Sequence, residues 1–579
     1  MKRFIYIVLI AINLFVLSSC TPNEPEAAIP PKQGTTDPTR SCPRCSIDFL
    51  PTAAPGRTPP PAQEAWWNNT VFYEVFVRSF ADATTGPLAN DGIGDLQGLI
   101  ENLDYLNDGD PTTTDDLGVT GIWLMPIMPS PSYHGYDVTD YYTLNKEYGT
   151  NEDFKRLLAE AHKRGIKVII DLVLNHTSSE HPWFVEARDN PESERREWYI
   201  WSQETPNYIG PWGQQVWHPS PSGYYYGLFW SGMPDLNYEN SQVTAEMQDA
   251  ARFWLEDAGV DGFRLDAARH MIEEGSIQEN TAATHEWWQS FRAVYKASNP
   301  EALTVGEIWS KGPDVVSYLQ GDELDLAFDF DLAEAILRGV MVRNAGVIQE
   351  ALASSYNLFG NNLSATFLTN HDMNRVMSQP AMDEGKARLA ASVLMTAPGV
   401  PFVYYGEEIG MTGKKPDELI RTPMQWSVED NAGFTTGSPW QPVNDDYKEK
   451  NVAIQSKDTT SLLSFYRELI HLRADHPALQ VGEYSPVESE DNDLLALLRV
   501  SQEEIVLVII NLNKNIARDY DLTLGGGSLA GTYRAFPLYG SAAVLPDLTA
   551  NDKGGFDDYR PLPEIPGEGM VVIQLQTIE

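Results

Sequence analysis

The sequence predicts an α/β protein: a (β/α)8 TIM barrel with a subdomain inserted after the third strand and a C-terminal antiparallel β-sandwich domain. Three observations predict it. Between residues 71 and 408, eight short runs rich in β-branched and aromatic residues alternate with helical patterns. The spacer after the third run is too long and irregular for one helix. From about residue 478 onward, apolar and polar residues alternate, as in DLLALLRV and EEIVLVIINLN.

The eight runs, interpreted as the barrel strands, are VFYEVFV (71–77), GVTGIWLMP (118–126), IKVIIDLVLNH (166–176), VDGFRLDAA (260–268), LTVGEIW (303–309), LDLAFDF (324–330), SATFLTN (364–370) and PFVYYGEE (401–408). The spacer 150–165 begins with Thr150 and Asp153 in capping positions, continues with apolar residues at helical spacing and ends at Gly165. Spacers 245–259 and 385–399 have the same period and the same glycine stop.

The domain boundaries follow from these patterns. The barrel is predicted at 66–176 and 241–477, the inserted domain at 177–240 and the β-domain at 478–579. The insert is dense in tryptophan and tyrosine, and such aromatic side chains more often form a small core than a binding platform. We expect most of them to be buried and a few to face a cleft.

The N-terminus predicts export. Residues 1–19 have a charged start and a short apolar run, as signal peptides do. LSSC (17–20) resembles a bacterial lipobox, so Cys20 is expected to carry lipid and anchor a cell-envelope lipoprotein outside the cytoplasm. The alternative is a plain secretory signal with an incidental cysteine. Residues 20–65, rich in Pro, Thr, Ala and Glu, suit a flexible tether, in which Cys42 and Cys45 form a small-loop disulfide or are two incidental thiols.

The chain is strongly acidic, with 41 basic and 82 acidic residues and a net charge of -41. Such a surface repels nucleic acid and anionic lipid headgroups, which favours a neutral or cationic substrate. The simpler explanation of so many carboxylates is a solvated surface, whether or not it is adapted to salt.

Polar residues accumulate where the predicted strands end, and in a barrel these ends share one mouth. They are His134, Tyr136 and Asp137; Asp171, Asn175 and His176; Arg264 and Asp266; Glu307; and Asn370, His371 and Asp372. No Cys/His ligand set, Ser-His-Asp order or phosphate-binding glycine loop accompanies them. Paired carboxylates with neutral histidines suit cleavage of a glycosidic bond.

Four segments resemble, in order, the four signature regions of the α-amylase family, glycoside hydrolase family 13: DLVLNH (171–176), GFRLDAARH (262–270), GEIW (306–309) and FLTNHD (367–372). The resemblance covers about residues 66 to 579. It implies that Asp266 is the nucleophile, Glu307 the general acid/base and Asp372 the carboxylate that grips sugar hydroxyls. Arg264 would keep Asp266 ionised by lowering its pKa, and Asp171 would be structural. The substrate-binding residues it implies are His134, Tyr136, Asp137, His176, Arg264, Arg269, His270, His371 and Arg421.

DGIGDLQG (91–98) resembles the last part of a family calcium loop, with Asp91, the Ile93 carbonyl and Asp95 as ligands and Asp82 as a further one. The segment TTGPLAN departs from the family pattern, and a plain turn with solvated acids is the alternative. Asn175 resembles the ligand of a second calcium site. No organic cofactor is expected.

Two further motifs concern specificity. MPDLN (233–237) and RTPMQW (421–426) resemble a group between oligo-1,6-glucosidases and neopullulanases. Ala267 stands where a valine accompanies α-1,6 specificity, and Arg269-His270 resembles the Lys-His pair with which α-amylases hold a sugar beyond the cleaved bond. The expected function is a monomeric, endo-acting, retaining α-1,4-glucan hydrolase acting on starch and maltooligosaccharides. The alternatives are α-1,6 or transfer specificity on the same triad and a non-catalytic glucan-binding lipoprotein.

Overall fold

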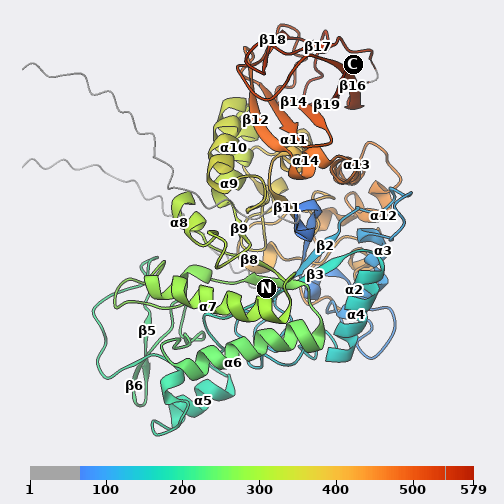
Figure 1. The fold of residues 1–579 in the computed structure, drawn as a ribbon. Helices are drawn as coiled ribbons and strands as arrows, with labels where there is room; N and C mark the ends of the chain where they lie inside the picture. Colours follow the sequence, from blue (N-terminus) through green and yellow to red (C-terminus); the bar gives the residue numbers. More distant parts are fainter. Residues whose placement is uncertain (1–64, 542, 579) are drawn as a thin grey trace, which may run out of the picture. The chain divides into compact units, whose positions relative to one another are not determined.

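The computed structural model describes residues 65–541 and 543–578 (Figure 1). The predicted signal peptide, the lipidation site Cys20, almost all of the tether, and Cys42 with Cys45 lie outside the described residues. Within the described residues, no helix combines the length and the apolar character needed to cross a bilayer.

Eight parallel strands close into a barrel in the order β1-β11-β10-β9-β8-β7-β3-β2, which confirms the predicted fold class. They are β1 (Phe72–Val75), β2 (Gly121–Leu124), β3 (Lys167–Leu172), β7 (Gly262–Leu265), β8 (Leu303–Gly306), β9 (Leu326–Phe328), β10 (Ser364–Thr366) and β11 (Val400–Tyr404). Each overlaps one of the predicted runs. Apart from Lys167 every strand residue is buried, as expected for parallel strands covered by helices on the outside.

Helices surround the strands (Figure 1). The longer ones are α4 (Asn151–Lys163), α6 (Ser241–Arg252), α7 (Ala282–Ser298), α9 (Phe330–Val342), α10 (Ala345–Phe359), α11 (Glu384–Thr396) and α13 (Leu462–Asp475). The shorter ones are α1 (Val77–Phe80), α2 (Leu96–Glu101), α3 (Leu103–Leu106), α8 (Gly312–Ser317), α12 (Val452–Gln455) and α14 (Pro477–Val481).

The helix boundaries follow local chemistry. At α4, the Thr150 hydroxyl accepts the Asp153 N–H while the Asp153 carboxylate accepts the Thr150 N–H, which is the predicted capping box. One expectation is wrong. α11 ends at Thr396 and not at Gly399, because Ala397 precedes a proline and takes an extended backbone, with φ -65° and ψ 156°.

The inserted domain contains α5 (Pro182–Asp189) and a three-stranded antiparallel sheet in the order β4 (Trp201–Ser202), β6 (Gly223–Tyr226) and β5 (Trp217–Ser220). Most of its aromatic side chains are buried or half-buried, whereas Trp212 and Trp230 are 56% and 51% exposed. This agrees with the expectation of a small aromatic core and a few outward-facing rings.

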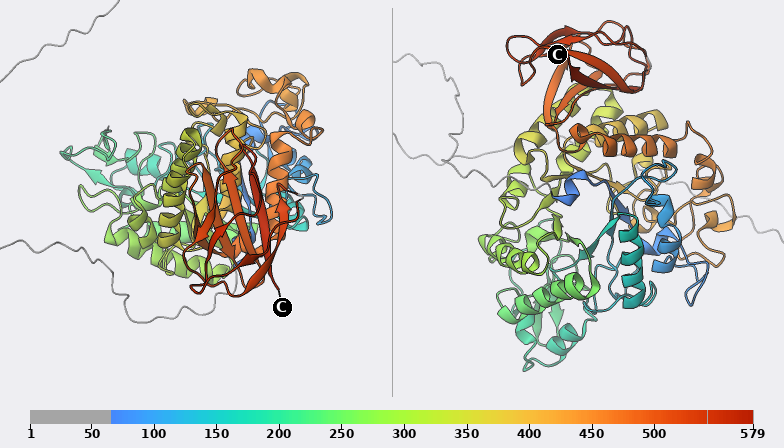
Figure 2. Two further views of the ribbon diagram at one scale, coloured as in Figure 1. Left: turned by 90° about the horizontal axis from the view of Figure 1, so that it is seen from above. Right: turned by 45° about the vertical axis from the view of Figure 1, so that its right-hand side comes forward.

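The C-terminal domain contains eight antiparallel strands in the order β17-β16-β19-β14-β13-β12-β15-β18. They are β12 (Glu483–Ser489), β13 (Leu494–Val500), β14 (Ile505–Asn511), β15 (Leu522–Leu524), β16 (Thr532–Tyr539), β17 (Leu548–Thr549), β18 (Phe556–Tyr559) and β19 (Met570–Thr577). Side chains of β14 alternate between two cores. Val506, Val508 and Ile510 join the barrel core beside α11, and Leu507 and Ile509 join the domain's own core. Figure 2 shows the C-terminal strands gathered on one side of the barrel.

Candidate active site

Arg264 lies at the centre of a group of carboxylates at the carboxyl ends of the barrel strands. Its Nη1 donates to both oxygens of Asp171, at 2.9 and 3.0 Å, and to Oδ1 of Asp266, at 2.8 Å. Its Nη2 donates to Oε2 of Glu307, at 2.8 Å. The arginine is 1% exposed, so three carboxylates share one buried cation.

Strand register explains this arrangement. Asp171 of β3 is directly paired with Arg264 of β7, and side chains two residues apart on one strand point the same way, which brings Asp266 to the same side. The backbone turns immediately afterwards, because Ala267 takes a left-handed conformation with φ 49°. Glu307 follows β8 and its N–H donates to the Leu265 carbonyl, at 3.0 Å.

Asp372 is held from the opposite side of the mouth. Arg421 Nη2 donates to its Oδ1, at 2.7 Å, and His371 Nε2 lies 3.2 Å from its Oδ2. His371 Nδ1 lies 2.6 Å from Oε1 of Glu74, a buried residue of β1. Tyr136 joins the two halves of the site, since its hydroxyl contacts both His371 Nε2, at 2.7 Å, and Oδ2 of Asp171, at 3.0 Å.

The pKa values of two residues differ from expectation. Burial raises the pKa of Asp266 to about 6; Arg264 acts to lower it, as predicted, but burial together with Asp171 outweighs the cation. Burial opposes protonation of His371, but the carboxylates of Asp372 and Glu74 raise its pKa to about 9, so this histidine is a cation and not the neutral donor we expected.

The pKa values of Glu307 and Asp372 are shifted in opposite directions, as acid/base chemistry requires. Burial raises the pKa of Glu307, and Asp266 raises it further against the lowering effect of Arg264. Burial also acts to raise the pKa of Asp372, but His371 and Arg421 hold it well below its usual range. Glu307 is thus placed to carry a proton while Asp372 stays ionised.

These residues open into a cleft of about 830 Å³. It is lined by the carboxylates Asp266, Glu307 and Asp372, by the predicted residues His134, Tyr136, His176, Arg269, His270 and Arg421, and by Ala267, Trp212, Phe229, Trp230, Met233, Trp309, Lys415 and Asp417. The inserted domain supplies one apolar wall, through Trp212, Phe229, Trp230 and Met233.

The histidines of the cleft have different environments. Burial lowers the pKa of His176 to about 3, so this residue is neutral, and its Nε2 lies 3.1 Å from the Tyr136 carbonyl. Burial likewise lowers the pKa of His134. Asp137, like Arg264 and His371, is not among the residues that line the cleft, and its assignment to substrate binding stays a prediction. It is buried and accepts hydrogen bonds from the hydroxyls of Ser130 and Ser132, so it holds its own loop.

Arg269 and His270 form a contact pair on the wall of the cleft. Arg269 Nε donates to Nε2 of His270, at 2.9 Å, and its guanidinium forms an ion pair with Glu279, at 3.2 Å. His270 Nδ1 lies 2.7 Å from the Gln278 carbonyl, and burial lowers the pKa of His270 to about 4. Both ring nitrogens of His270 are thus engaged within the protein, and the residue orients Arg269, the fixed cation of the pair.

Residues 74–482 match the family model described as the alpha amylase catalytic domain. The chain belongs to the alpha-amylase family. It is 41% identical over 457 residues to Alpha-amylase 3 of Dictyoglomus thermophilum, which covers 78% of this chain and 86% of that protein. It is 33% identical over 528 residues to an oligo-1,6-glucosidase of Parageobacillus thermoglucosidasius, which covers 78% of this chain and 91% of that protein. The crystal structure of an alpha-amylase from H. orenii matches with a TM-score of 0.76 at 41% identity, covering 88% of this chain and 99% of that one.

This member of the alpha-amylase family is a glycosidase that hydrolyses α-glucosidic bonds. Its site includes residues that sequence reasoning missed, chiefly Glu74 and Trp309. Glu74 had a signal, a lone acid inside the apolar run VFYEVFV. Trp309 was visible in GEIW, but nothing in the sequence indicated that it is 54% exposed and lines the cleft.

In the loop that resembles the family's calcium site, two of the predicted ligands accept hydrogen bonds from within the protein. The Asp82 carboxylate accepts the N–H groups of Asn90 and Gly92, at 2.9 and 2.8 Å, and the Thr435 hydroxyl, at 2.5 Å. Asp95 caps α2 and accepts the Gly98 N–H, at 2.8 Å. Among the residues that the structure describes, no three His, Cys, Asp or Glu side chains are grouped to hold a metal. The predicted site of Asp82, Asp91, the Ile93 carbonyl and Asp95 includes a backbone ligand and stays a prediction.

The second predicted calcium position has two carboxyls beside Asn175. Asn175 Nδ2 donates to the His270 carbonyl, at 2.6 Å. Beside it, burial raises the pKa of Asp235 to about 8, and burial together with Asp235 raises that of Glu273. Oδ2 of Asp235 and Oε1 of Glu273 have no hydrogen-bond partner among the described residues. Two adjacent carboxyls, one on a buried and one on a half-buried residue, each with an oxygen that lacks a partner, require a shared proton or a cation.

Proposed function

We propose that this glycosidase is an endo-acting, retaining α-1,4-glucan hydrolase that cleaves starch and maltooligosaccharides. The observation that carries the proposal is the Arg269-His270 pair on the wall of a cleft of about 830 Å³. A pair that holds a sugar beyond the cleaved bond adds binding energy only for longer chains, and that energy can be used to position the reacting bond.

The mechanism begins with protonation of the glycosidic oxygen by Glu307, whose raised pKa keeps the proton available. Ionised Asp266, oriented by Arg264 Nη1, attacks the anomeric carbon from the opposite face as the bond to the leaving oxygen breaks. A covalent glycosyl-enzyme results, and the leaving sugar departs with the proton from Glu307.

In the second step Glu307, now a carboxylate, takes a proton from water, and the resulting oxygen nucleophile displaces Asp266 from the anomeric carbon. Two inversions give retention, which requires the two carboxyls to be roughly 5 Å apart. Asp372 remains ionised between His371 and Arg421 and accepts hydrogen bonds from the sugar ring hydroxyls. Cationic His371 holds Asp372 in its ionised form, and neutral His176 lines the cleft beside Tyr136.

Product time courses on amylose, pullulan and isomaltose test the linkage. The proposal expects internal cleavage of amylose to maltose and short oligomers, with little action on isomaltose. Faster hydrolysis of isomaltose than of amylose would favour the second candidate, an oligo-1,6-glucosidase or transferase on the same triad. That candidate rests on the MPDLN and RTPMQW motifs, which bring Met233 and Arg421 to the cleft. No turnover of any α-glucan would favour a non-catalytic glucan-binding protein.

The stereochemistry is tested separately by proton NMR of the first product. Retention predicts that the α-anomer appears first and mutarotates later. Initial β-anomer would contradict double displacement.

We further propose a structural calcium ion at the second position, held by Asp235, Glu273, the His270 carbonyl and Asn175, whose amide turns over to direct its oxygen at the ion. Carboxylate and carbonyl oxygens are the ligands that this hard cation prefers. A chelator should lower the melting temperature of the wild type but not that of Asp235→Asn. An equal effect on both proteins would argue against this site.

Attachment to the cell envelope through lipid on Cys20 is proposed from the LSSC motif. The variant Cys20→Ala should release active, monomeric enzyme into the soluble fraction. Unchanged membrane association would exclude lipidation at this residue.

A further inference from the structure

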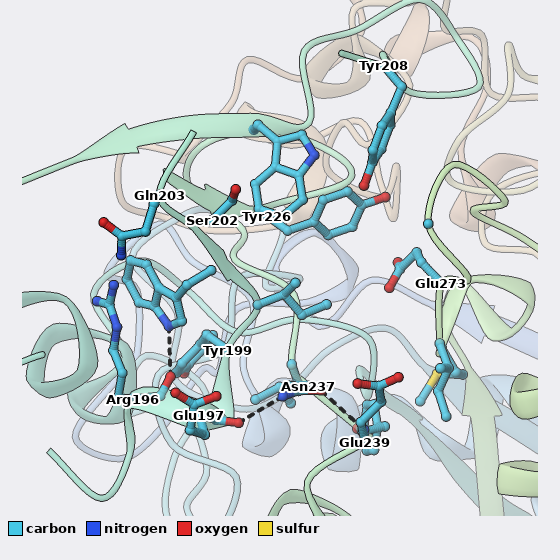
Figure 3. Close-up of a pocket in the computed structure, with 18 residues that line it drawn as sticks. Arg196, Glu197, Tyr199, Ser202, Gln203, Tyr208, Tyr226, Asn237, Glu239 and Glu273 are labelled. Atoms are coloured by element: carbon cyan, nitrogen blue, oxygen red, sulfur yellow. Dashed lines mark hydrogen bonds between the residues drawn. The ribbon is translucent and has the colours of Figure 1, made fainter. Parts of the chain in front are cut away.

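An aromatic ring can hold a sugar only if one of its faces is exposed. The cavity in the inserted domain (Figure 3) does not meet this condition. Its rings Trp217 and Tyr226 are 6% and 1% exposed and pack with Val216 and Leu228 into the core of that domain. Trp309 meets it, since it is 54% exposed.

Trp309 lies where the catalytic cleft meets a smaller groove, which we call the α9 groove. This groove has a volume of about 270 Å³ and is bounded by Trp309, Met373 and one face of α9. Trp309 lines both the cleft and the groove. It follows Glu307 by two residues, and Met373 directly follows Asp372. The α9 groove therefore begins beside the catalytic carboxylates and continues the cleft.

The indole ring of Trp309 is held in place by the protein. It stacks on Phe330, with ring centroids 4.8 Å apart and planes at 6°. Phe330 in turn packs edge-on against Phe367, with centroids 5.1 Å apart and planes at 82°. Arg269 Nη1 donates to the Trp309 carbonyl, which fixes the backbone. Phe330 covers one face of the indole, and the exposed fraction leaves the opposite face as a preorganised platform.

The wall formed by α9 is polar at its edge. Asp331, Glu334, Arg338 and Met341 recur at the spacing of one helix face and all line the groove. The first three are exposed. Their carboxylates can accept, and the guanidinium can donate, hydrogen bonds to hydroxyl groups. Acids and a base are mixed, so this wall suits an uncharged, hydroxyl-rich ligand.

The contact between Arg269 and Trp309 places the α9 groove on the side of the leaving sugar. Arg269 belongs to the pair that is proposed to hold a sugar beyond the cleaved bond, and Glu307 protonates the leaving oxygen. In an α-1,4-glucan the bond that breaks joins C1 of one sugar to O4 of the next, so the leaving portion carries the reducing end. The groove thus lies in the path of that portion.

We propose that the α9 groove extends the substrate cleft and binds further sugars on the reducing-end side of a long α-glucan. This inference rests on the proposed function for the identity of the chain. A trisaccharide that spans the cleaved bond has too few sugars on the leaving side to pass Trp309. The groove therefore adds binding energy only for longer chains, and it raises their kcat/KM alone.

The test replaces two exposed residues of the groove, Glu334→Ala together with Arg338→Ala, which keeps the net charge and places good helix formers on α9. Because hydrogen bonds to charged groups are lost, kcat/KM on maltoheptaose should fall about tenfold, while kcat/KM on maltotriose stays within about twofold of the wild type. With maltoheptaose labelled at its reducing end, the labelled products should become shorter, because fewer sugars are held on the leaving side.

The matched control is Glu152→Ala together with Lys155→Ala. These residues also form an acid and base pair on one helix, with 3.5 Å between their charged groups, but they line neither the groove nor the cleft. The control should give wild-type kinetics and wild-type products. If the groove variant does not fold, Gln379→Ala, which also lines the groove, takes its place with the same expectations.

Unchanged kinetics and products on maltoheptaose would overturn the groove and keep the proposed function. Equal losses on maltoheptaose and maltotriose, or longer labelled products, would also overturn the groove. A wild-type enzyme that cleaves no maltooligosaccharide would instead contradict the proposed function itself.

Discussion

Replacing Arg264 with methionine tests the centre of the site most directly. The substitution removes four hydrogen bonds to three carboxylates, two of them to Asp171 and one each to Asp266 and Glu307. Breaking a buried ion pair from one side costs about 3–5 kcal/mol, because the remaining charge is left uncompensated. Arg264→Met should therefore melt at a lower temperature than the wild type while still folding around the intact hydrophobic core.

The effect on catalysis follows from the pKa values. Asp266 has a pKa of about 6 with the cation present, so at pH 7 it is mostly ionised. An adjacent opposite charge changes a pKa by about 1–3 units, so losing the cation would bring the pKa of Asp266 to roughly 7–9 and its ionised fraction at pH 7 to between about one half and one hundredth. With the nucleophile also free to rotate, kcat should fall by at least about 100-fold, or about 2.7 kcal/mol.

The assay is kcat/KM on maltoheptaose from pH 5 to pH 10, with circular dichroism to verify folding. The pH profile of Arg264→Met should move to higher pH, because both Asp266 and Glu307 lose the group that lowers their pKa. The control, Arg264→Lys, keeps a charge but loses the forked geometry of the guanidinium. Its kcat/KM and its pH profile should lie between those of the wild type and Arg264→Met. Activity within about tenfold of the wild type with an unmoved profile would refute the reasoning.

Three other predictions concern stability and chain length. The pKa of His371 is raised to about 9 from an ordinary 6.5. Its protonation therefore adds roughly 3 kcal/mol to the free energy of unfolding, which is fully present below pH 6.5 and is lost as the pH rises through 9. Melting temperatures should thus fall between pH 7 and pH 10 by more in the wild type than in His371→Gln, and parallel curves would contradict the assignment. His270→Ala should lower kcat/KM about tenfold on long maltooligosaccharides and spare short activated substrates; equal losses on both would speak against a sugar site there. Thr150→Ala removes the capping box of α4 and should cost about 1 kcal/mol in denaturant unfolding with no change in kcat, whereas a cost near zero would show that the cap is unimportant.

The alternation of apolar runs and helical spacers was sufficient to predict the barrel. A parallel strand buried on both faces must be apolar throughout, and a helix packed on it must repeat its apolar residues every three or four positions. These requirements are local, so they can be read along the chain. The two residues of the capping box, Thr150 and Asp153, likewise lie in one short segment. The chemistry of the site was also foreseeable, because the barrel topology brings all strand ends to one mouth.

The sequence by itself determined the fold class, the order of the strands and the residue types at the mouth. Only the tertiary structure decided which of those residues meet and in what protonation state. Asp137 accepts a hydrogen bond from Ser130 of its own loop. Glu74 contacts His371 from a strand almost 300 positions earlier, and the effect of burial on the pKa of Asp266 exceeds that of Arg264. The physical reason is that side-chain direction, desolvation and Coulomb interaction depend on distances in space between residues far apart in the chain. Neither spacing nor composition contains those distances.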